Sequence, residues 1–367
     1  MLPEEKLALI EKGKEAVLDH EDLVEILDGD AAMENALVKA GAAVLKRTLG
    51  NSVYLRGIVE ISNACQKNCF YCGLRRDNTG LARYSMPYEE IVDALRRGYD
   101  SGLRSFLLQS GEMLGGAHID KVVRVLEWMG EEYGDSVRMV LSLGELPKGV
   151  LKRLRKAGGD RYLLRIEASD QDLYMKLHPR NSIHRYSSRL KCLEDLRETG
   201  WQVGTGVLIG VPWQDVENLA NDLQFMQRMD VDMCGMGPYL EHEDTPFWEK
   251  RKLIPPREQR YRWTLRMIAL LRILMPNINI AATTALQTIS PSGLERGLAA
   301  GANVFMPNLT PLKYRRNYDL YEGKAEVHDT LEDVVKKMVR RCKAIGRPVD
   351  LDDPGDPVHY LERTGRD

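Results

Sequence analysis

VYLRGIVEISNACQKNCFYCGLRRD, residues 53–77, joins an apolar run to a loop that holds three cysteines. Most residues of the run at 53–62 are apolar and several are β-branched, which predicts a largely buried strand. Directly after it, Cys65, Cys69 and Cys72 form a C-x₃-C-x₂-C pattern within one short loop. The segment therefore predicts a strand whose carboxyl end carries a group of thiols.

The same rhythm of a short apolar run followed by a longer amphipathic segment repeats along the chain to about residue 307. With 53–62, the strand candidates are 105–110, 138–143, 161–168, 202–210, 232–239, 279–285 and 302–307. Helical stretches such as YEEIVDALRRGYDSG and KGVLKRLRKAGG lie between them, and several stop at Gly. Alternation of this kind predicts parallel strands closed into a (β/α)₈ barrel, with an open doubly wound sheet as the structural alternative.

Three regions are expected. Residues 1–50 have helical periodicity and form an N-terminal helical extension, and residues 51–345 form the barrel. Residues 346–367 form a C-terminal tail, and its Pro- and Asp-rich stretch PVDLDDPGDP predicts an exposed position at the surface.

Composition excludes several classes of protein. Hydrophobic residues make up 43% of the chain, which is ample for a large core, and the net charge is −2. A near-neutral balance gives no reason to expect nucleic acid or a membrane surface as partner. No apolar run is long enough to span a membrane, and the first residues lack a signal core, so the cytoplasm is the expected location. Three crowded and three scattered cysteines indicate a metal site in a reducing compartment rather than a disulfide framework.

The cysteine loop favours an iron–sulfur cluster. Tetrahedral zinc sites take four ligands, so this triplet would need a distant His or Cys, and that alternative stays open. A 4Fe–4S cluster held by three cysteines keeps one iron free for another ligand. The spacing, with Tyr71 before the third cysteine, resembles the radical S-adenosylmethionine (SAM) superfamily. That resemblance implies one 4Fe–4S cluster on Cys65, Cys69 and Cys72, SAM as the open iron's ligand, and reductive cleavage to a 5′-deoxyadenosyl radical.

Polar residues at the carboxyl ends of the strand candidates lie where barrels carry their active sites. QSGE at 109–112 resembles the superfamily's motif for the SAM amino group, although it also fits a plain turn. Glu167 suits the two ribose hydroxyls because a carboxylate accepts at both oxygens. Arg189 suits the SAM carboxylate, with a solvated helix arginine as the alternative. The predicted cofactor-binding residues are Tyr71, against adenine, and Gln109, Ser110, Gly111, Glu112, Ser142, Glu167 and Arg189.

Between residues 53 and 325 the chain resembles the FeFe-hydrogenase maturase HydE family, relatives of biotin synthase and methylornithine synthase. The likeness is carried by LLQSGE, LSLGE, RYLLRIEAS, GPYLEHEDTP, AATTALQTI and MPNLTPLKYRRNY. It implies a barrel around a long, partly charged cavity and a substrate that is an iron bearing cysteine, carbon monoxide and cyanide. It also implies the maturases HydG and HydF, and an electron donor, as partners. The matching cavity residues are Arg56, Arg161, Arg165, Thr283, Thr284, Met306, Tyr318 and Tyr321.

The chemistry of that set is consistent with an anionic substrate. An unpaired arginine inside an apolar strand, such as Arg56, is costly unless it binds something. Arg161 and Arg165 lie four apart on a strand candidate, hence on one face, and we expect both to converge with Arg56 in the barrel mouth. The two threonines also fit ordinary strand positions, and the two tyrosines also fit core anchors.

The chain departs from the family in two places. Some HydE proteins hold an accessory cluster near the C-terminus on three further cysteines, but EGKAEVHDTLEDVVKKM (322–338) has none, so that site is predicted absent. Ile166 stands between Arg165 and Glu167, where some members have histidine. Of the three remaining cysteines, Cys192 and Cys234 are expected to be small buried residues, and Cys342 is a lone cysteine within a predicted helix.

Three other functions compete with hydrogenase maturation. A HydE-like paralogue or a methylornithine-synthase-like mutase would act on an organic amino acid, and it too needs arginine for a carboxylate. A non-catalytic iron–sulfur or zinc scaffold leaves QSGE, Glu167 and Arg189 without a role. A nucleic-acid-modifying activity lacks an added RNA-binding domain and a basic surface.

Overall fold

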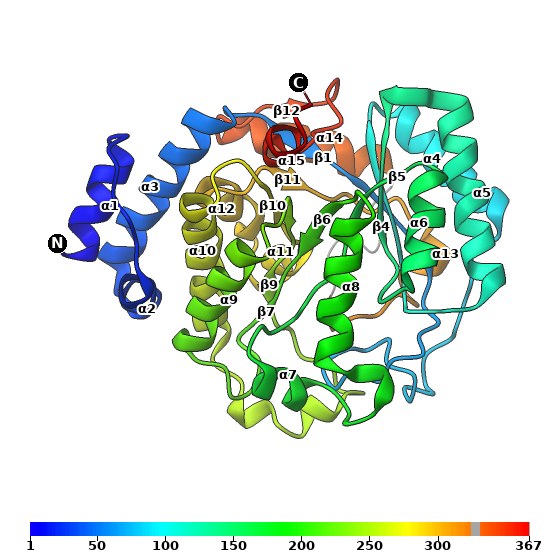
Figure 1. Cartoon of the computed structure of the whole chain (residues 1–367), viewed down its shortest axis with the longest axis horizontal. Helices are drawn as coiled ribbons and strands as arrows, with labels where there is room; N and C mark the ends of the chain where they lie inside the picture. Colours follow the sequence, from blue (N-terminus) through cyan, green and yellow to red (C-terminus); the bar gives the residue numbers. More distant parts are fainter. Residues whose placement is uncertain (324–330, 367) are drawn as a thin grey trace.

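The computed structural model describes residues 1–323 and 331–366 of the chain, which folds as a (β/α)₈ barrel (Figure 1). The strands are β1 Val53–Leu55, β2 Gly57–Ser62, β3 Ser105–Ser110, β4 Arg138–Ser142, β5 Gly159–Leu163, β6 Gln202–Thr205, β7 Leu208–Ile209, β8 Met233–Cys234, β9 Gly237–Pro238, β10 Asn279–Ala282, β11 Val304–Phe305 and β12 Val349–Asp350. The helices that follow them are α4 Tyr88–Asp100, α5 Gly116–Tyr133, α6 Lys148–Lys156, α7 Gln171–Leu177, α8 Tyr186–Glu198, α9 Val216–Arg228, α10 Arg257–Leu274, α11 Thr284–Ile289, α12 Gly293–Ala300, α13 Leu312–Arg315, α14 Leu331–Ala344 and α15 Val358–Thr364.

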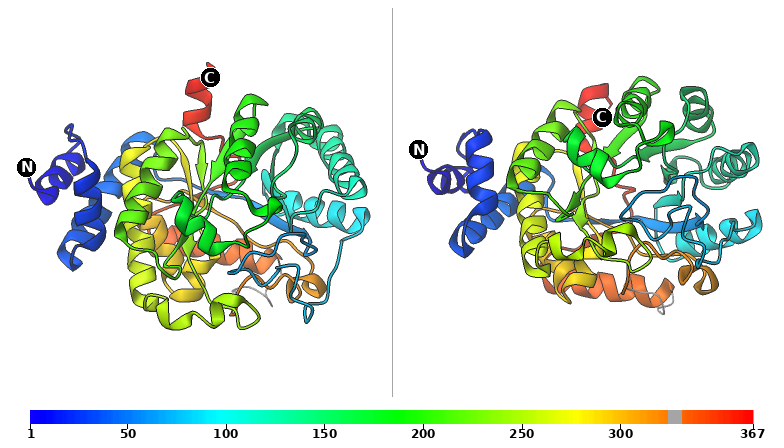
Figure 2. Two further views of the ribbon diagram at one scale, coloured as in Figure 1. Left: turned by 60° about the horizontal axis from the view of Figure 1, so that its bottom comes forward. Right: turned by 90° about the horizontal axis from the view of Figure 1, so that it is seen from below.

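The sheet closes on itself through its first strand. β1 pairs in parallel with β11, and β2, which continues the same extended segment, pairs in parallel with β3. A further parallel bridge joins Ile58 to Asn308 and completes the seam. With β1 and β2 counted as one strand, and likewise β6 with β7 and β8 with β9, the ring has eight members. The predicted barrel is confirmed, and Figure 2 shows its helices surrounding the strands.

Three predicted strands are interrupted, and the first of them, the candidate at 53–62, is divided into β1 and β2. The candidates at 202–210 and 232–239 each form two short pieces, and β7 and β9 pair with each other in a separate two-stranded sheet. Both of these interruptions lie at a close approach between Gly206 and Gly235. A Cβ on Gly206 would lie 2.2 Å from the Gly235 carbonyl oxygen, so a side chain has no room there. The candidate at 161–168 also ends early, at Leu163, where the Thr205 hydroxyl donates to Leu164 O at 2.9 Å. Arg165 and Glu167 therefore stand in the loop beyond β5.

The N-terminal helices α1 Pro3–Glu11, α2 His20–Asp28 and α3 Ala31–Thr48 stand outside the ring of barrel helices (Figure 2). Asp19 and Asp22 cap α2 reciprocally, each carboxylate accepting from the other residue's backbone N–H. Gly41 lets α3 approach the barrel, since a Cβ there would lie 2.8 Å from Ala300 O. Glu34 of α3 adds an ion pair to Arg262 of α10 at 3.0 Å. The three-part division of the chain itself stays a prediction.

The expectation that the C-terminal tail is exposed is wrong for its central part. β12 extends the sheet beside β1, so backbone pairing holds the tail against the amino-terminal end of the barrel. Further along the tail, Asp356 forms an ion pair with Arg161 at 2.7 Å and another with Arg138 at 2.9 Å. The Pro- and Asp-rich composition could not show that the Asp356 carboxylate has a buried partner in Arg161.

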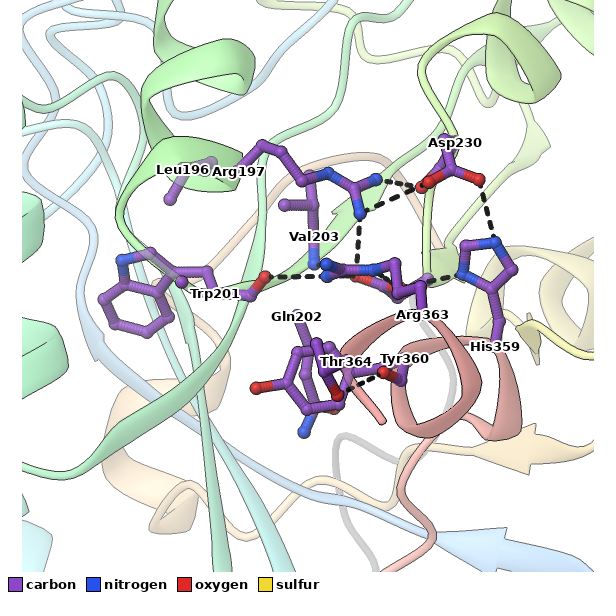
Figure 3. Close-up of polar contacts among 12 residues, drawn as sticks. Leu196, Arg197, Trp201, Gln202, Val203, Asp230, His359, Tyr360, Arg363 and Thr364 are labelled. Carbon is purple, nitrogen blue, oxygen red and sulfur yellow. Dashed lines mark hydrogen bonds and ion pairs between the residues drawn. The ribbon is translucent and has the colours of Figure 1, made fainter. Parts of the chain in front are cut away.

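The last helix, α15, is fastened to the same end of the barrel (Figure 3). His359 lies between two carboxylates, with Nδ1 2.9 Å from Asp232 and Nε2 2.9 Å from Asp230. Arg363 donates to both oxygens of the fully buried Asp232 at 2.8 Å. In Figure 1 this end is at the top, and α7, which follows the carboxyl end of β5, is at the bottom. The tail thus closes one end of the barrel, and the opposite end carries the cavity.

Candidate active site

A cavity of about 320 Å³ occupies the carboxyl-terminal half of the barrel, a volume suited to a small ligand. Its charged lining residues in the described chain are Glu60, Arg165, Glu167 and Arg189, and the rest of the wall is mainly leucine, glycine and hydroxyl groups. The predicted site residues on the lining are Cys69, Tyr71, Cys72, Gln109, Ser110, Ser142, Arg165, Glu167, Arg189, Thr283, Thr284, Met306 and Tyr321. Most of the set inferred from sequence thus meets in one space.

The three cysteines of the loop are free thiols, and Cys69 and Cys72 lie at the edge of this cavity. Burial raises the pKa of the Cys69 thiol to about 12. Burial also raises the pKa of Cys72, and the neighbouring Cys69 and Cys65 raise it further. Thiolates so buried and so close need a positive partner, which the iron of a cluster provides. The donor set therefore fits an iron–sulfur cluster.

No three His, Cys, Asp or Glu side chains in residues 1–323 and 331–366 surround one point as the ligands of a single metal ion do. Each cysteine of a 4Fe–4S cluster binds a different iron. The three thiols therefore surround the volume of the whole cluster and do not converge on one metal ion. Gly111 leaves room beside that volume, because a Cβ on it would lie 2.8 Å from Cys65 Cβ and 2.3 Å from Ala64 O. Glycine is thus required at position 111, where the loop after β3 passes the cysteine loop.

The base of the cysteine loop is held by polar side chains. Asn63 donates to Asn317 O at 2.6 Å and accepts from Tyr84 N at 2.7 Å. Arg83 donates to Asn63 O at 2.7 Å and to Leu74 O at 2.9 Å, on the two sides of the thiols. Arg83 was not predicted, because nothing in its local pattern distinguishes it from a surface arginine.

Glu112 faces the cysteine loop rather than the cavity. Its Oε1 accepts from Gln66 Nε2 at 3.1 Å, and its Oε2 accepts from the backbone N–H of Glu145 at 2.8 Å. Burial raises the pKa of Glu112, and the charge of Lys67, 3.3 Å away, opposes that shift. Of the QSGE motif, Gln109 and Ser110 line the cavity, while Gly111 and Glu112 pack behind it.

A buried network of four charges connects the cysteine loop to Arg189. Lys67 Nζ lies 3.0 Å from Glu145 Oε1, and Arg189 Nε lies 2.6 Å from the same oxygen. With Glu112 this makes two cations and two carboxylates, all largely withdrawn from solvent. Lys67 and Glu145 were missed from sequence, where a lysine between ligand cysteines gives no sign of its partner. The network fixes the position of Arg189 relative to the thiols.

Glu167 has a strained backbone, with φ of 68°. This left-handed conformation is uncommon for a residue with a side chain and costs on the order of 1 kcal/mol. Neighbours hold it: Glu167 N donates to Gly206 O at 3.1 Å, and Leu208 N donates to Glu167 O at 3.0 Å. The carboxylate lies 3.1 Å from Arg165, and burial raises its pKa. Strain maintained at a cavity wall indicates a functional position.

The turn after Glu167 is clamped by two further side chains. Ser169 N donates to Asp222 Oδ1 at 2.7 Å, and the Tyr186 hydroxyl donates to Ser169 O at 2.5 Å. Asp222 comes from α9 and Tyr186 from α8, so two barrel helices restrain the turn. Neither residue was a sequence candidate, because each lies on a helix without a motif.

The expected convergence of three arginines is wrong. Arg165 lines the cavity, but Arg56 and Arg161 do not, among the described residues. Arg161 donates to Gln202 and Ser105, each at 2.8 Å, and pairs with Asp356 of the tail. Arg56 donates to Gly355 O at 3.2 Å, near the same end. The two-residue period of a strand predicts the face on which a side chain lies, but not its position along the barrel axis. In addition, β5 ends between Arg161 and Arg165, so the two residues are not on one strand.

The far wall of the cavity carries hydroxyl groups. Thr284 and Tyr321 are hydrogen-bonded at 3.1 Å, and the buried hydroxyl of Thr283 has no partner within the described residues. Met306 adds an apolar surface, whereas Tyr318 is buried behind the wall. Asn308 donates to Glu60 at 3.2 Å, and both line the cavity. Glu60 was overlooked in sequence although it interrupts the apolar run GIVEIS.

The other cysteines lie apart from this site. Cys192 and Cys234 are buried, as expected, and Cys342 is buried on α14. The accessory-cluster prediction concerns 322–338, of which residues 324–330 lie outside the described chain. No helix in the described residues has the length and apolar character needed to cross a membrane.

Comparison with known proteins agrees with this geometry. The Radical SAM superfamily model matches residues 59–225. The FeFe hydrogenase maturase subunit HydE of Thermotoga maritima is 40% identical over 342 residues, covering 92% of this chain and 94% of that protein. The 3-methylornithine synthase of Methanosarcina acetivorans is 27% identical over 335 residues, covering 90% and 89%.

The fold has a solved counterpart. The crystal structure of methylornithine synthase superposes with a TM-score of 0.78 at 24% identity, covering 94% of this chain and 97% of that one. At this identity the likeness concerns the fold alone, whereas the likeness to HydE extends along nearly the whole sequence. The chain is an enzyme that belongs to the HydE family of hydrogenase maturases within the radical SAM superfamily.

Proposed function

We propose that this enzyme cleaves SAM reductively and acts on a small anionic iron synthon during maturation of FeFe-hydrogenase. The carrying observation is a single cavity with Cys69 and Cys72 on one side and Arg165, Thr284 and Tyr321 on another. The extended likeness to HydE supports the choice of pathway. A cavity of this size confines a radical together with a small substrate.

Membership of the superfamily implies a 4Fe–4S cluster and SAM. In our proposal Cys65, Cys69 and Cys72 hold one such cluster, which supplies the electron that breaks a carbon–sulfur bond of SAM to give a 5′-deoxyadenosyl radical. Glu167 accepts hydrogen bonds from the ribose hydroxyls, and Arg189 pairs with the SAM carboxylate. The QSGE segment binds the amino group through the backbone at Gln109 and Ser110, with Gly111 and Glu112 supporting it. Tyr71 lies against adenine, and Ser142 completes the wall.

The substrate end relies on fewer cations than sequence suggested. Arg165 supplies positive charge for carboxylate or cyanide ligands, and the Thr283 hydroxyl, which has no partner among the described residues, is a donor that a ligand would satisfy. Thr284 and Tyr321 add further hydrogen-bonding groups, while Met306 excludes water. Tyr318 is buried behind this wall, whereas Arg56 and Arg161 contact the tail at the other end of the barrel and take no part in the proposed substrate site. A cysteine-bound iron with carbon monoxide and cyanide matches this combination of charge and apolar surface.

The proposed partners are HydG, which would deliver the synthon, HydF, which would receive the product, and a separate electron donor. The free cysteines suit a reducing compartment such as the cytoplasm. The competing function is a mutase acting on an organic amino acid, favoured by the 27% identity with 3-methylornithine synthase.

The test replaces HydE with this protein in an anaerobic maturation mixture containing HydG, HydF and apo-hydrogenase. We expect hydrogenase activity, together with release of 5′-deoxyadenosine that depends on the synthon. Absence of activation, with 5′-deoxyadenosine released on addition of an organic amino acid instead, would transfer the assignment to the mutase. A sample reconstituted without iron serves as the control.

A further inference from the structure

A second hollow opens on the outer surface beside the cysteine loop. It measures about 510 Å³ and is formed by the chain between α7 and the first turn of α8. In Figure 1 this segment lies at the bottom of the molecule, opposite the end that α15 closes. Its lining residues are Gln171, Met175, His178, Pro179, Arg180, Asn181, Ser182, His184, Arg185, Tyr186 and Ser187. We call it the α7–α8 cleft.

The inner wall of the α7–α8 cleft touches the cysteine loop directly. His184 Nε2 accepts from the backbone N–H of Asn68 at 2.9 Å, and His178 Nε2 lies 3.3 Å from the Tyr71 hydroxyl. Asn68 and Tyr71 flank Cys69 and precede Cys72. One layer of side chains therefore separates a molecule in the cleft from the thiols.

The rim of the cleft is cationic and unpaired. Residues 171–188 contain Lys176, Arg180 and Arg185 against a single carboxylate, Asp172. All three cations are exposed, and within the described residues none has an ion pair with a carboxylate. Lys191, further along α8, instead pairs with Asp195 at 3.0 Å. A concentration of unpaired positive charge attracts a negatively charged partner.

Apolar groups adjoin these cations. Ile183 is 37% exposed on the cleft segment, and Trp213 is 41% exposed with Lys176 5.9 Å from its ring centre. Trp213 also contacts Phe247, whose N–H donates to Phe70 O of the cysteine loop at 3.2 Å. Exposed aromatic and arginine side chains are enriched in protein–protein interfaces.

We propose that the α7–α8 cleft and its rim are the docking surface for a small acidic electron-transfer protein carrying flavin or an iron–sulfur centre. The inference rests on the proposed function, since reductive cleavage of SAM consumes one electron that this chain does not hold. The reduced partner loses one electron and the oxidised cluster gains it, with no group transferred. His178 and His184 then lie between the two redox centres.

The test uses the anaerobically reconstituted holoenzyme with an acidic flavodoxin as probe. The double variant R180E/R185E reverses the unpaired charges, and K12E/K14E makes the same charge change on exposed residues near α1. We expect R180E/R185E to weaken flavodoxin binding at least tenfold in low-salt calorimetry and to slow reduction by flavodoxin. K12E/K14E should match the unsubstituted enzyme. Affinity of the unsubstituted enzyme should fall as salt rises, and R180E/R185E should lose most of that dependence.

A small chemical reductant separates this inference from the proposed function. With dithionite, R180E/R185E should release 5′-deoxyadenosine within twofold of the unsubstituted rate, because its cleavage site is intact. Unchanged flavodoxin affinity in R180E/R185E, or equal losses in K12E/K14E, would overturn the docking surface. Absence of dithionite-driven SAM cleavage in the unsubstituted enzyme would instead overturn the proposed function.

Discussion

Lys67, between two of the predicted cluster ligands, forms a buried ion pair with Glu145 at 3.0 Å. The same Glu145 oxygen holds Arg189, so one carboxylate connects the cysteine loop to the residue proposed to bind the SAM carboxylate. Neither partner can turn to solvent, since the Lys67 and Arg189 side chains are only 5% and 8% exposed. The position of Arg189 relative to the thiols therefore depends on Glu145.

Glu145→Gln should loosen this connection. Removing one partner of a buried pair costs about 3 kcal/mol or more, because the remaining charges stay buried without compensation. We expect a lower free energy of unfolding in urea, and a KM for SAM raised roughly tenfold, about 1.4 kcal/mol. Glu198→Gln is the matched control, because Glu198 is half-exposed where it pairs with Lys148, and it should change stability by under about 0.5 kcal/mol. An unchanged KM in Glu145→Gln would show that Arg189 is positioned independently.

Glu167 should separate binding from backbone strain. Glu167→Ala removes the proposed ribose contact and should weaken SAM binding by about 1–3 kcal/mol. Glu167→Gly removes the same contact, yet glycine adopts the φ of 68° freely, so its unfolding free energy should exceed that of the Ala variant. Calorimetric SAM titration and urea unfolding measure the two effects. Equal SAM affinity in Glu167→Ala and the unsubstituted enzyme would remove Glu167 from the cofactor site.

The cysteine loop gives a stoichiometry that can be measured. Anaerobic reconstitution should load about four irons per chain, as one 4Fe–4S cluster requires. Cys69→Ala should lose them, whereas Cys342→Ala, which removes a buried cysteine on α14, should retain them. Iron analysis and electron paramagnetic resonance of the reduced protein provide the readouts. About eight irons that survive Cys69→Ala would contradict both the cluster assignment and the predicted absence of an accessory cluster.

Local patterns made much of this molecule predictable. The alternation of apolar runs with amphipathic segments and the cysteine triplet are local patterns, so the barrel and the loop at the end of its first strand could be predicted from sequence, whereas several strand ends could not. The Lys67–Glu145 pair joins residues 78 positions apart and has no local pattern. Arg161 shows a second limit, because its partner Asp356 lies in the tail, 195 positions away, and no local pattern shows which end of the barrel Arg161 faces.

The fastening of α15 should depend on pH. The hydrogen bond to Asp232 raises the pKa of His359 above its ordinary value, and burial opposes this in part. A raised folded-state pKa means that the protonated ring stabilises the fold, fully below pH of about 6.5. That stabilisation is lost as the pH rises through the folded-state pKa. Melting temperatures measured from pH 6 upward should therefore fall more steeply than in His359→Gln. Parallel curves for the two proteins would contradict the contribution of His359.

The placement of the arginines predicts opposite behaviour for two residues on the same predicted strand face. Arg165→Leu removes the cavity cation nearest the proposed substrate and should lower synthon-dependent turnover roughly 100-fold, about 2.7 kcal/mol, with iron content unchanged. Arg161→Leu breaks the buried contact with Asp356 and should destabilise the fold by about 3 kcal/mol. Its turnover per folded molecule should stay within twofold, because Arg161 does not line the cavity among the described residues. Turnover in the anaerobic maturation mixture and urea unfolding give the two readouts. If Arg161→Leu loses turnover as severely as Arg165→Leu while remaining folded, the substrate reaches the closed end of the barrel and Arg161 belongs to the site after all.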